Sequence, residues 1–353
     1  MPGLDRFSSS TATPRIAAST TASATPESCA NRPSDPVIPV LDAKAGNFAA
    51  ELRRASRDVG FVSVVGHGIP NTLLDRVRST LRALFAFPDE QKRRLMIEPR
   101  NYRGFIPLGF FTPNRVEANG DRGDRYEGYK LHWECPPDHP VRAACDLYGP
   151  NRWPADIPEL RAVIQDYWAA CDRVAAPIMA AYADGLGIDP DVFAHWHTTP
   201  LTNMTLLHYP AQPPASDAMG IHPHKDSNVI TLLHPGDVPG LEVRSRNGEW
   251  ITPDAPSDAL VVNVGEMLEL WSGGEYVATP HRVVNRSGQE RYSFPFFVVP
   301  NHDVVVEPLL PRRTGYTTKP MPVGELSAEV WRTNWPDETP STAGHDLGTL
   351  DRT

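Results

Sequence analysis

Two histidines and one aspartate have the residue types and spacing of a metal site. His224 and Asp226 stand two residues apart, directly before the apolar run Val229–Leu233, and His281 begins a later β-rich segment. Alternate residues of a strand face the same side, so His224 and Asp226 can point together. Two imidazoles and one carboxylate on one face of a ferrous ion leave positions open for a bidentate co-substrate and O₂.

Other metal sites fit the sequence less well. A closed zinc site needs a fourth protein ligand, and the four cysteines show no C-x-x-C spacing. His222 forms an H-x-H pair with His224, which would suit a cupin-like zinc or manganese site, but Asp226 and the lack of a downstream cupin Glu pattern argue against it. A single H-x-D pair is ordinarily structural, so the assignment depends on its neighbours.

A second group of residues could hold a dicarboxylate. Arg291 and Ser293 are two apart in a predicted strand, which places a guanidinium and a hydroxyl on one face. A guanidinium binds a carboxylate with two parallel hydrogen bonds. Tyr209, at the end of another predicted strand, offers a phenol.

With these motifs, the sequence resembles the isopenicillin N synthase-like 2-oxoglutarate/Fe(II) dioxygenases. The order of H-x-D, the segment Pro280–Asn285 around His281, and R-x-S is typical of that family, as is Gly60–Pro70. The resemblance implies a double-stranded β-helix, iron held by His224, Asp226 and His281, and the distal carboxylate of 2-oxoglutarate held by Arg291, Ser293 and Tyr209. Two residues depart from the family pattern, Leu207 and Lys225.

The implied activity is oxidation of a small-molecule, secondary-metabolite substrate with O₂ and 2-oxoglutarate, releasing succinate and CO₂. Hydroxylation, desaturation and oxidative ring formation stay open, and ascorbate would serve as a reductant. An Fe(II) oxidase of the isopenicillin N synthase type, which needs no 2-oxoglutarate, is the alternative. That enzyme supplies a Gln near its C-terminus, and none follows Gln289 here. A binding protein without activity and a metal-dependent isomerase fit the intact motifs poorly.

Substrate contacts are expected from loops and strand faces around the barrel mouth. Arg103 and Lys130 are two cations among aromatic residues, which suits a carboxylate-bearing substrate. The predicted contacts are Tyr102, Arg103, Phe105, Lys130, His132, Trp133 and Phe297.

The elements that must position these residues follow from hydrophobic periodicity. Helices are predicted over 48–59, over 71–87 with Asn71 as the N-cap, and over 159–186, ended by Gly185 and Gly187. Strands are predicted over 61–65 and 129–133. Further short strands are predicted over 204–208, 229–233, 241–243, 250–252, 259–264, 281–284 and 293–299, with a hairpin at Asn247-Gly248.

This pattern predicts a mainly β protein with flanking helices, in which a jelly-roll core follows an N-terminal α/β region. The expected organisation is a disordered tail over 1–36, an N-terminal α/β region over 37–155, a jelly-roll core with its long backing helix over 156–335, and a loose tail over 336–353.

Composition narrows the partners. The net charge is −9 with no basic block, which argues against nucleic acid and anionic membranes. No apolar run reaches 18 residues and no secretion signal is evident, so we expect a cytoplasmic protein acting on a small molecule as a monomer or weak homodimer.

Overall fold

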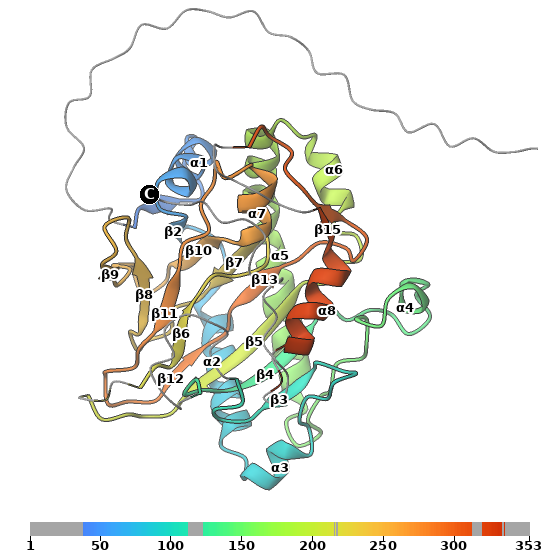
Figure 1. The fold of residues 1–353 in the computed structure, drawn as a ribbon. Coiled ribbons are helices and arrows are strands. Elements are labelled where there is room, and N and C mark those ends of the chain that lie inside the picture. Colours follow the sequence, from blue (N-terminus) through green and yellow to red (C-terminus); the bar gives the residue numbers. More distant parts are fainter. Residues whose placement is uncertain are drawn as a thin grey trace, which may run out of the picture. The chain divides into compact units, whose positions relative to one another are not determined.

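The computed structural model describes residues 38–111, 123–214, 216, 218–312, 320–333 and 335. Both predicted tails, 1–36 and 336–353, lie outside the described residues. The described residues belong to one compact unit. Figure 1 shows the arrangement of its helices and strands.

The larger sheet has nine strands in the order β1-β2-β10-β7-β13-β5-β4-β3, with β12 also paired to β5. Its strands are β1 (Val40–Asp42), β2 (Phe61–Val65), β3 (Gly104–Ile106), β4 (Glu127–His132), β5 (Asn203–Tyr209), β7 (Ile230–Leu233), β10 (Leu260–Val264), β12 (Arg291–Ser293) and β13 (Phe296–Val298).

The smaller sheet has four strands in the order β6-β11-β8-β9. They are β6 (Ile221–His224), β11 (His281–Val283), β8 (Leu241–Arg244) and β9 (Trp250–Ile251). Leu241 and Val243 of this sheet form a buried cluster with Phe61 and Val261 of the larger sheet, so side chains of the two sheets pack against each other. Two packed sheets of this kind agree with the jelly-roll core that the strand pattern predicted and with the double-stranded β-helix that the family resemblance implied.

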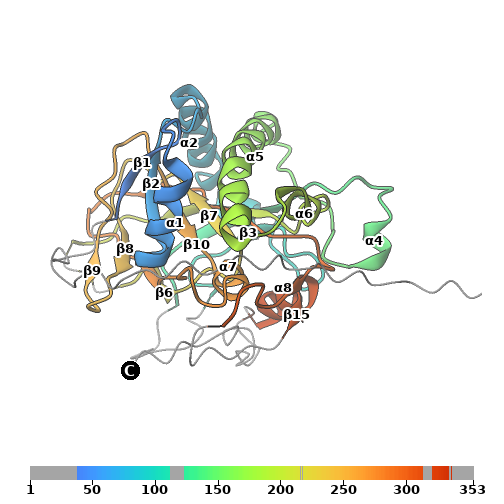
Figure 2. The ribbon, with the colours of Figure 1, turned by 90° about the horizontal axis from the view of Figure 1, so that it is seen from above.

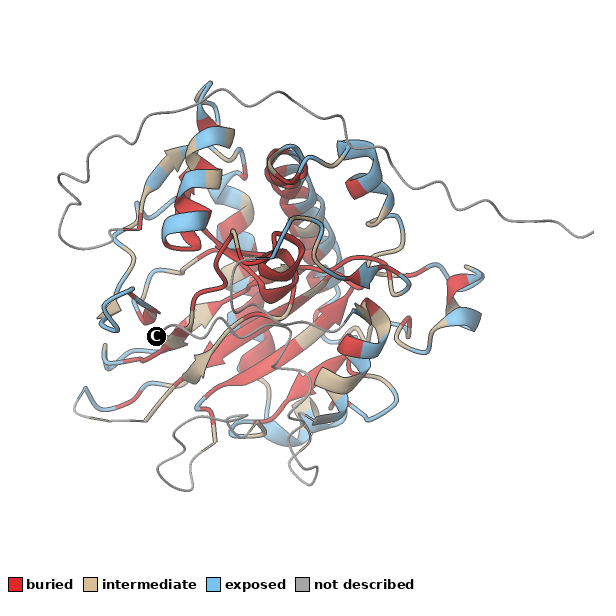
Figure 3. Ribbon diagram, turned by 45° about the horizontal axis from the view of Figure 1, so that its top comes forward, coloured by how far each residue is buried: buried red, intermediate tan, exposed pale blue. Residues whose placement is uncertain are grey.

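Three helices cover the other face of the larger sheet: α1 (Phe48–Asp58), α2 (Asn71–Phe85) and α5 (Glu159–Leu186) (Figure 2). The apolar stripe of α5 is buried in the main core, and the polar face of the helix is exposed (Figure 3). The helix ends at Gly187, whose φ of 68° is the left-handed conformation that glycine adopts without strain.

Several predicted boundaries shift. The N-cap of α2 is Pro70 rather than Asn71, which is the first helical residue. Gly185 lies inside α5, where an added Cβ would clash with the Tyr276 hydroxyl, so this glycine serves close packing rather than termination. The predicted strand 293–299 is split into β12 and β13, because Pro295 has no N–H to donate to a ladder.

Short elements complete the unit. They are α3 (Asp89–Arg93), α4 (Val141–Ala144), α6 (Pro190–His195), α7 (Glu266–Trp271), β14 (Val305–Val306), β15 (Met321–Pro322) and α8 (Val323–Thr333). The sequence did not predict α7, because all six of its residues are buried and leave no amphipathic period.

The predicted boundary between residues 155 and 156 does not separate two sheets. β2 pairs with β10 and β4 pairs with β5, so strands from the predicted N-terminal region are part of the same sheet as strands of the predicted core. The N-terminal region therefore contributes directly to the larger sheet, whereas His224 and His281 belong to the smaller one.

Candidate metal and co-substrate site

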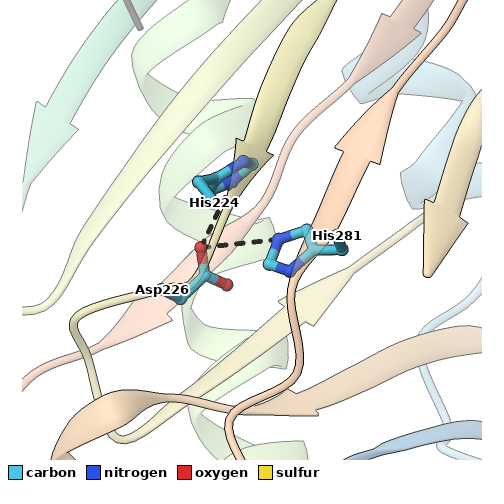
Figure 4. A group of neighbouring side chains, drawn as sticks. All are labelled: His224, Asp226 and His281. Atoms are coloured by element: carbon cyan, nitrogen blue, oxygen red, sulfur yellow. Dashed lines mark ion pairs between the residues drawn. The ribbon is translucent and has the colours of Figure 1, made fainter. Parts of the chain in front are cut away.

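Strand register brings the two histidines together. His281 of β11 is the register partner of His224, the last residue of β6, and the centres of their rings lie 4.3 Å apart. Asp226 follows in the turn, with its Oδ1 3.7 Å from Nε2 of His224 and 3.6 Å from Nε2 of His281 (Figure 4). The three ligand atoms lie within 4.8 Å of one another, which is close enough for one ion.

The remaining polar atoms of this trio are already engaged. Nδ1 of His224 lies 2.8 Å from the His222 carbonyl, and Nδ1 of His281 lies 3.1 Å from the Thr279 carbonyl. A carbonyl only accepts, so each Nδ1 carries the proton and each Nε2 keeps its lone pair. This hydrogen bond from the second ring nitrogen is the usual support of a metal-binding histidine.

The carboxylate of Asp226 is oriented in the same way. Its Oδ2 accepts from the Thr231 hydroxyl at 2.5 Å and from the Asn263 amide at 2.9 Å. Oδ1 is thereby left to face the histidines. The donor set and its orientation fit a ferrous ion held by two imidazoles and one carboxylate.

Electrostatics keep these groups in the forms that bind a cation. Burial alone would raise the pKa of Asp226, but His281, His224 and the donors Thr231 and Asn263 together lower it. Burial, with the neighbouring His224, lowers the pKa of His281 to about 4. The site is therefore an anionic carboxylate beside a neutral imidazole at neutral pH.

The three residues of the predicted dicarboxylate clamp lie next to one another. Arg291 of β12 is the register partner of Tyr209, and its guanidinium carbon lies 4.8 Å from the centre of that ring. Nη1 of Arg291 donates to Ser293 Oγ at 3.3 Å, and Nε and Nη2 donate to backbone carbonyls of the segment 235–238. No ion pair of Arg291 is found among the described residues, although its side chain is fully buried. Its positive charge is available for an anionic ligand.

His222 takes a different part from His224. Its Nδ1 lies 2.6 Å from Asp124 Oδ1, and its backbone N–H donates to the same oxygen. Among the described residues, the potential metal ligands that lie close together are His224, Asp226 and His281, and they do not include His222.

Some of the predicted substrate residues lie on the face of the larger sheet that points toward Asp226, and others lie on the opposite face. Antiparallel register partners face the same side of a sheet, and one row of partners runs from His132 through Asn203, Phe297 and Thr231 to Asn263, with Lys130 beside Thr205 in the next row. The same face carries Thr231 and Asn263, which donate hydrogen bonds to Asp226. Tyr102 reaches its edge, since the His132 ring lies 3.2 Å from the Tyr102 carbonyl.

Two predicted contacts are corrected. Phe105 is buried in the main core on the other face of β3, as the partner of Tyr129. Trp133 lines a cavity of about 180 Å³ together with Trp153 and Trp168 of α5, also on that side. Loop composition alone did not reveal which face each aromatic residue occupies, whereas alternation along β3 and β4 would have separated them.

Three residues at the site were not predicted. Thr231 and Asn263 orient Asp226, and they lie in runs that the sequence identified only as apolar strands; a polar residue inside such a run is the signal that was available. Trp331 of α8 stacks on Tyr102 with ring centres 5.2 Å apart and meets His132 at 4.6 Å. No periodic or motif signal linked that C-terminal residue to the site.

Two family models match the chain. Residues 36–156 match the model described as the non-haem dioxygenase in morphine synthesis N-terminal family, and residues 201–300 match the 2OG-Fe(II) oxygenase superfamily. A homoarginine-6-hydroxylase of Glycine max is 32% identical over 273 residues, which cover 75% of this chain and 81% of the relative. The chain belongs to the 2-oxoglutarate/Fe(II) dioxygenases.

Other members of the family are similar to this chain in sequence and in fold. The 2-oxoglutarate-Fe(II) type oxidoreductase hxnY of Emericella nidulans is 32% identical, with 74% of this chain and 77% of the relative covered. The structure of JOX2 in complex with 2OG, Fe and JA has 28% identity and a TM-score of 0.69, covering 83% of this chain and 84% of that one. A 2OG-Fe(II) oxygenase family protein of Caulobacter crescentus, at 29% identity and a TM-score of 0.71 over 83% and 97% of the two chains, shares the fold.

Family membership establishes the general reaction. The dioxygenase uses Fe(II) and 2-oxoglutarate to oxidise a small molecule with O₂, and 2-oxoglutarate becomes succinate and CO₂. Among the residues that the structure describes, no helix is long and apolar enough to cross a membrane.

Proposed function

We propose that His224, Asp226 and His281 bind the ferrous ion of this dioxygenase. The observation that carries the proposal is the convergence of their three ligand atoms within 4.8 Å, with both Nδ1 atoms and Asp226 Oδ2 hydrogen-bonded elsewhere. The bound iron would supply the activation of O₂ for attack on a C–H bond. The protein's part is to hold the three ligands in one orientation.

We also propose that Arg291, Ser293 and Tyr209 bind the distal carboxylate of 2-oxoglutarate. The guanidinium is buried beside the Ser293 hydroxyl and the Tyr209 ring, and it has only neutral hydrogen-bond acceptors among the described residues. Burial lowers the pKa of Arg291, although the guanidinium stays protonated. A carboxylate in this position would compensate the buried charge.

The proposed reaction is oxidation of a C–H bond of a secondary metabolite, with hydroxylation as the outcome that the named relatives favour. The relatives that carry this preference are named homoarginine-6-hydroxylases, one from Glycine max at 32% identity and one from Arabidopsis thaliana at 31% identity. Placement of the substrate carbon decides between hydroxylation and a second hydrogen abstraction.

Anaerobic titration tests both assignments. Fe(II) is added to the metal-free protein, 2-oxoglutarate follows, and the weak visible charge-transfer band of the chelated keto acid is recorded. We expect the band in the wild type and in Arg312→Met, an exposed control, and its loss in Asp226→Ala. In Arg291→Met the band should need a much higher 2-oxoglutarate concentration.

Two results would contradict the proposal. Iron binding that survives Asp226→Ala would mean that the metal site lies elsewhere. Unchanged affinity for 2-oxoglutarate in Arg291→Met would mean that another residue holds the distal carboxylate.

A further inference from the structure

Lys130 lies on the same face of the larger sheet as the donors that orient Asp226. It belongs to β4, and its register partner on β5 is Thr205. Its side chain is partly exposed to solvent. The register of the neighbouring strands places Lys130 on the face that carries Thr231 and Asn263, the donors to Asp226.

The ammonium group of Lys130 has one donor without an acceptor among the described residues. Nζ donates to Asn203 Oδ1 at 2.7 Å and to Thr205 Oγ1 at 3.0 Å, and an ammonium carries three N–H bonds. The Phe297 ring lies beside it, with its centre 5.0 Å from Nζ. Two neutral acceptors therefore hold the amine in place and leave its third N–H for a ligand.

The charge of Lys130 is not balanced by an ion pair within the described residues. Its two hydrogen-bond acceptors are neutral. Asp226, the carboxylate whose charge acts on Lys130, is already assigned to the iron as a proposed ligand. Isolated buried charges are costly, so they are normally compensated by a partner or a ligand. Burial accordingly lowers the pKa of Lys130 to about 7, and an anion beside Nζ would oppose that shift.

Arg103, the other cation expected to meet a carboxylate, is placed differently. Its Nη2 donates to the Leu147 carbonyl at 2.6 Å and its Nη1 to Asn101 Oδ1 at 3.2 Å. Trp331 of α8 lies over its guanidinium, with the ring centre 5.8 Å from the guanidinium carbon. Burial, with the neighbouring Arg142, lowers the pKa of Arg103 to about 10. Arg103 therefore connects its own segment, residues 101–103, to the backbone at Leu147.

We propose that Lys130 binds a carboxylate of the substrate, and that the substrate is a small carboxylic acid with an apolar or aromatic body. The inference rests on the proposed function and names the substrate class of that site. The apolar body is indicated by the aromatic and aliphatic residues near Lys130 and at the edge of the same face, which include Phe297, Leu207, Tyr102 and Trp331.

Paired ligands test the proposal without a known substrate. The protein is loaded with Fe(II) and 2-oxoglutarate under nitrogen and titrated in a calorimeter with phenylacetate, indole-3-acetate and octanoate, and with the matching primary amides. A charge-assisted hydrogen bond favours the acid by about tenfold or more. We expect that preference for at least one pair in the wild type and in Lys44→Met, an exposed control.

Lys130→Met should bind the acid and the amide about equally, with the 2-oxoglutarate absorption band intact. Lys130→Gln keeps a hydrogen-bond donor toward Asn203 and Thr205. It should also lose the preference for the acid, which provides a second test if methionine disturbs the packing at this position. Lys130→Arg, which keeps the charge, should retain part of the preference.

Three outcomes would overturn the inference. The first is no preference for the acid in the wild type, and the second is an undiminished preference in Lys130→Met and Lys130→Gln. The third is loss of 2-oxoglutarate binding in both variants, which would assign Lys130 to the co-substrate. Absence of the absorption band in the wild type would instead refute the proposed function, so the two failures are distinguishable.

Discussion

His224 and His281 use the same local hydrogen bond. Each ring donates from Nδ1 to the carbonyl of the residue two positions earlier, His222 or Thr279, so the strand backbone itself fixes the tautomer. The aspartate differs, because its orientation depends on two side chains from β7 and β10. At this scale the histidines are supported by their own strands and the carboxylate by its neighbours.

Removing a support of Asp226 should weaken metal binding. Thr231→Val keeps the size of the side chain but removes its hydrogen bond to Asp226 Oδ2. We expect the dissociation constant for Fe(II) to rise by roughly 10- to 100-fold, the usual effect of losing such a supporting contact. Anaerobic metal titration measures it, and Thr252→Val, at an exposed site, is the control. Equal affinity in the two variants would contradict the role assigned to Thr231.

Lys130 should make stability depend on pH in the alkaline range. In the folded protein its pKa is lowered to about 7, so the amine loses its proton above that pH, while the unfolded chain keeps the proton until about pH 10.4. The unfolded state then binds more protons, and the free energy of unfolding rises with pH between these values. Denaturant unfolding at pH 7 and pH 9.5 should show a larger gain for the wild type than for Lys130→Met. An equal change in both would show that Lys130 keeps an ordinary pKa.

The elements were predictable to different degrees. β2 and α5 were predicted with the bounds that the structure shows, because a short β-branched run and a long amphipathic period are strong local signals. The ligand trio was found from spacing and from the family resemblance. The faces of Phe105 and Trp133 and the approach of Trp331 were not found, because pairing between distant segments determines them.

The turn between α1 and β2 supports the segment that leads to His281. Gly60 has a φ of 74°, and an added Cβ would overlap the Val277 carbonyl oxygen and lie 2.8 Å from Thr279 Oγ1. The Thr279 hydroxyl donates to the Val59 carbonyl, and the Thr279 carbonyl holds His281. An N-terminal turn therefore supports the position of a proposed iron ligand from the C-terminal half.

Gly60→Ala should consequently affect both stability and metal binding. Left-handed strain of roughly 1–2 kcal/mol adds to an overpacking cost of typically about 1–3 kcal/mol. Fe(II) affinity should also fall, since the Thr279 carbonyl must move. Gly68→Ala is a matched control, because Gly68 has a φ of 80° but no atom within 4 Å of the added Cβ. Denaturant unfolding and metal titration on both variants should show a metal defect in Gly60→Ala alone.

At the scale of the whole protein, the site joins parts that are distant in the sequence. The proposed iron ligands come from β6, the turn after it and β11, while the proposed clamp comes from β5 and β12 of the other sheet. Metal and co-substrate together would therefore contact both sheets.

Ligand binding should raise the thermal midpoint. A ligand at roughly 100 times its dissociation constant stabilises the folded state by about 2.7 kcal/mol. We expect Mn(II), as a redox-stable substitute, to raise the midpoint, 2-oxoglutarate to raise it further, and a chelator to reverse both shifts. Asp226→Ala should show neither shift; a midpoint in that variant that still responds to Mn(II) would point to another metal site.

The position of β2 between β1 and β10 has a consequence for chain fragments. A fragment that begins at residue 201 would lack β2 and β4, so the backbone groups of β10 and β5 that pair with them would be exposed along two open sheet edges. Open apolar edges recruit strands from other molecules. Such a fragment, although it contains every proposed iron ligand, should aggregate when expressed alone, and co-expression of residues 36–200, which supply β2, β4 and the covering helix α5, should suppress that aggregation.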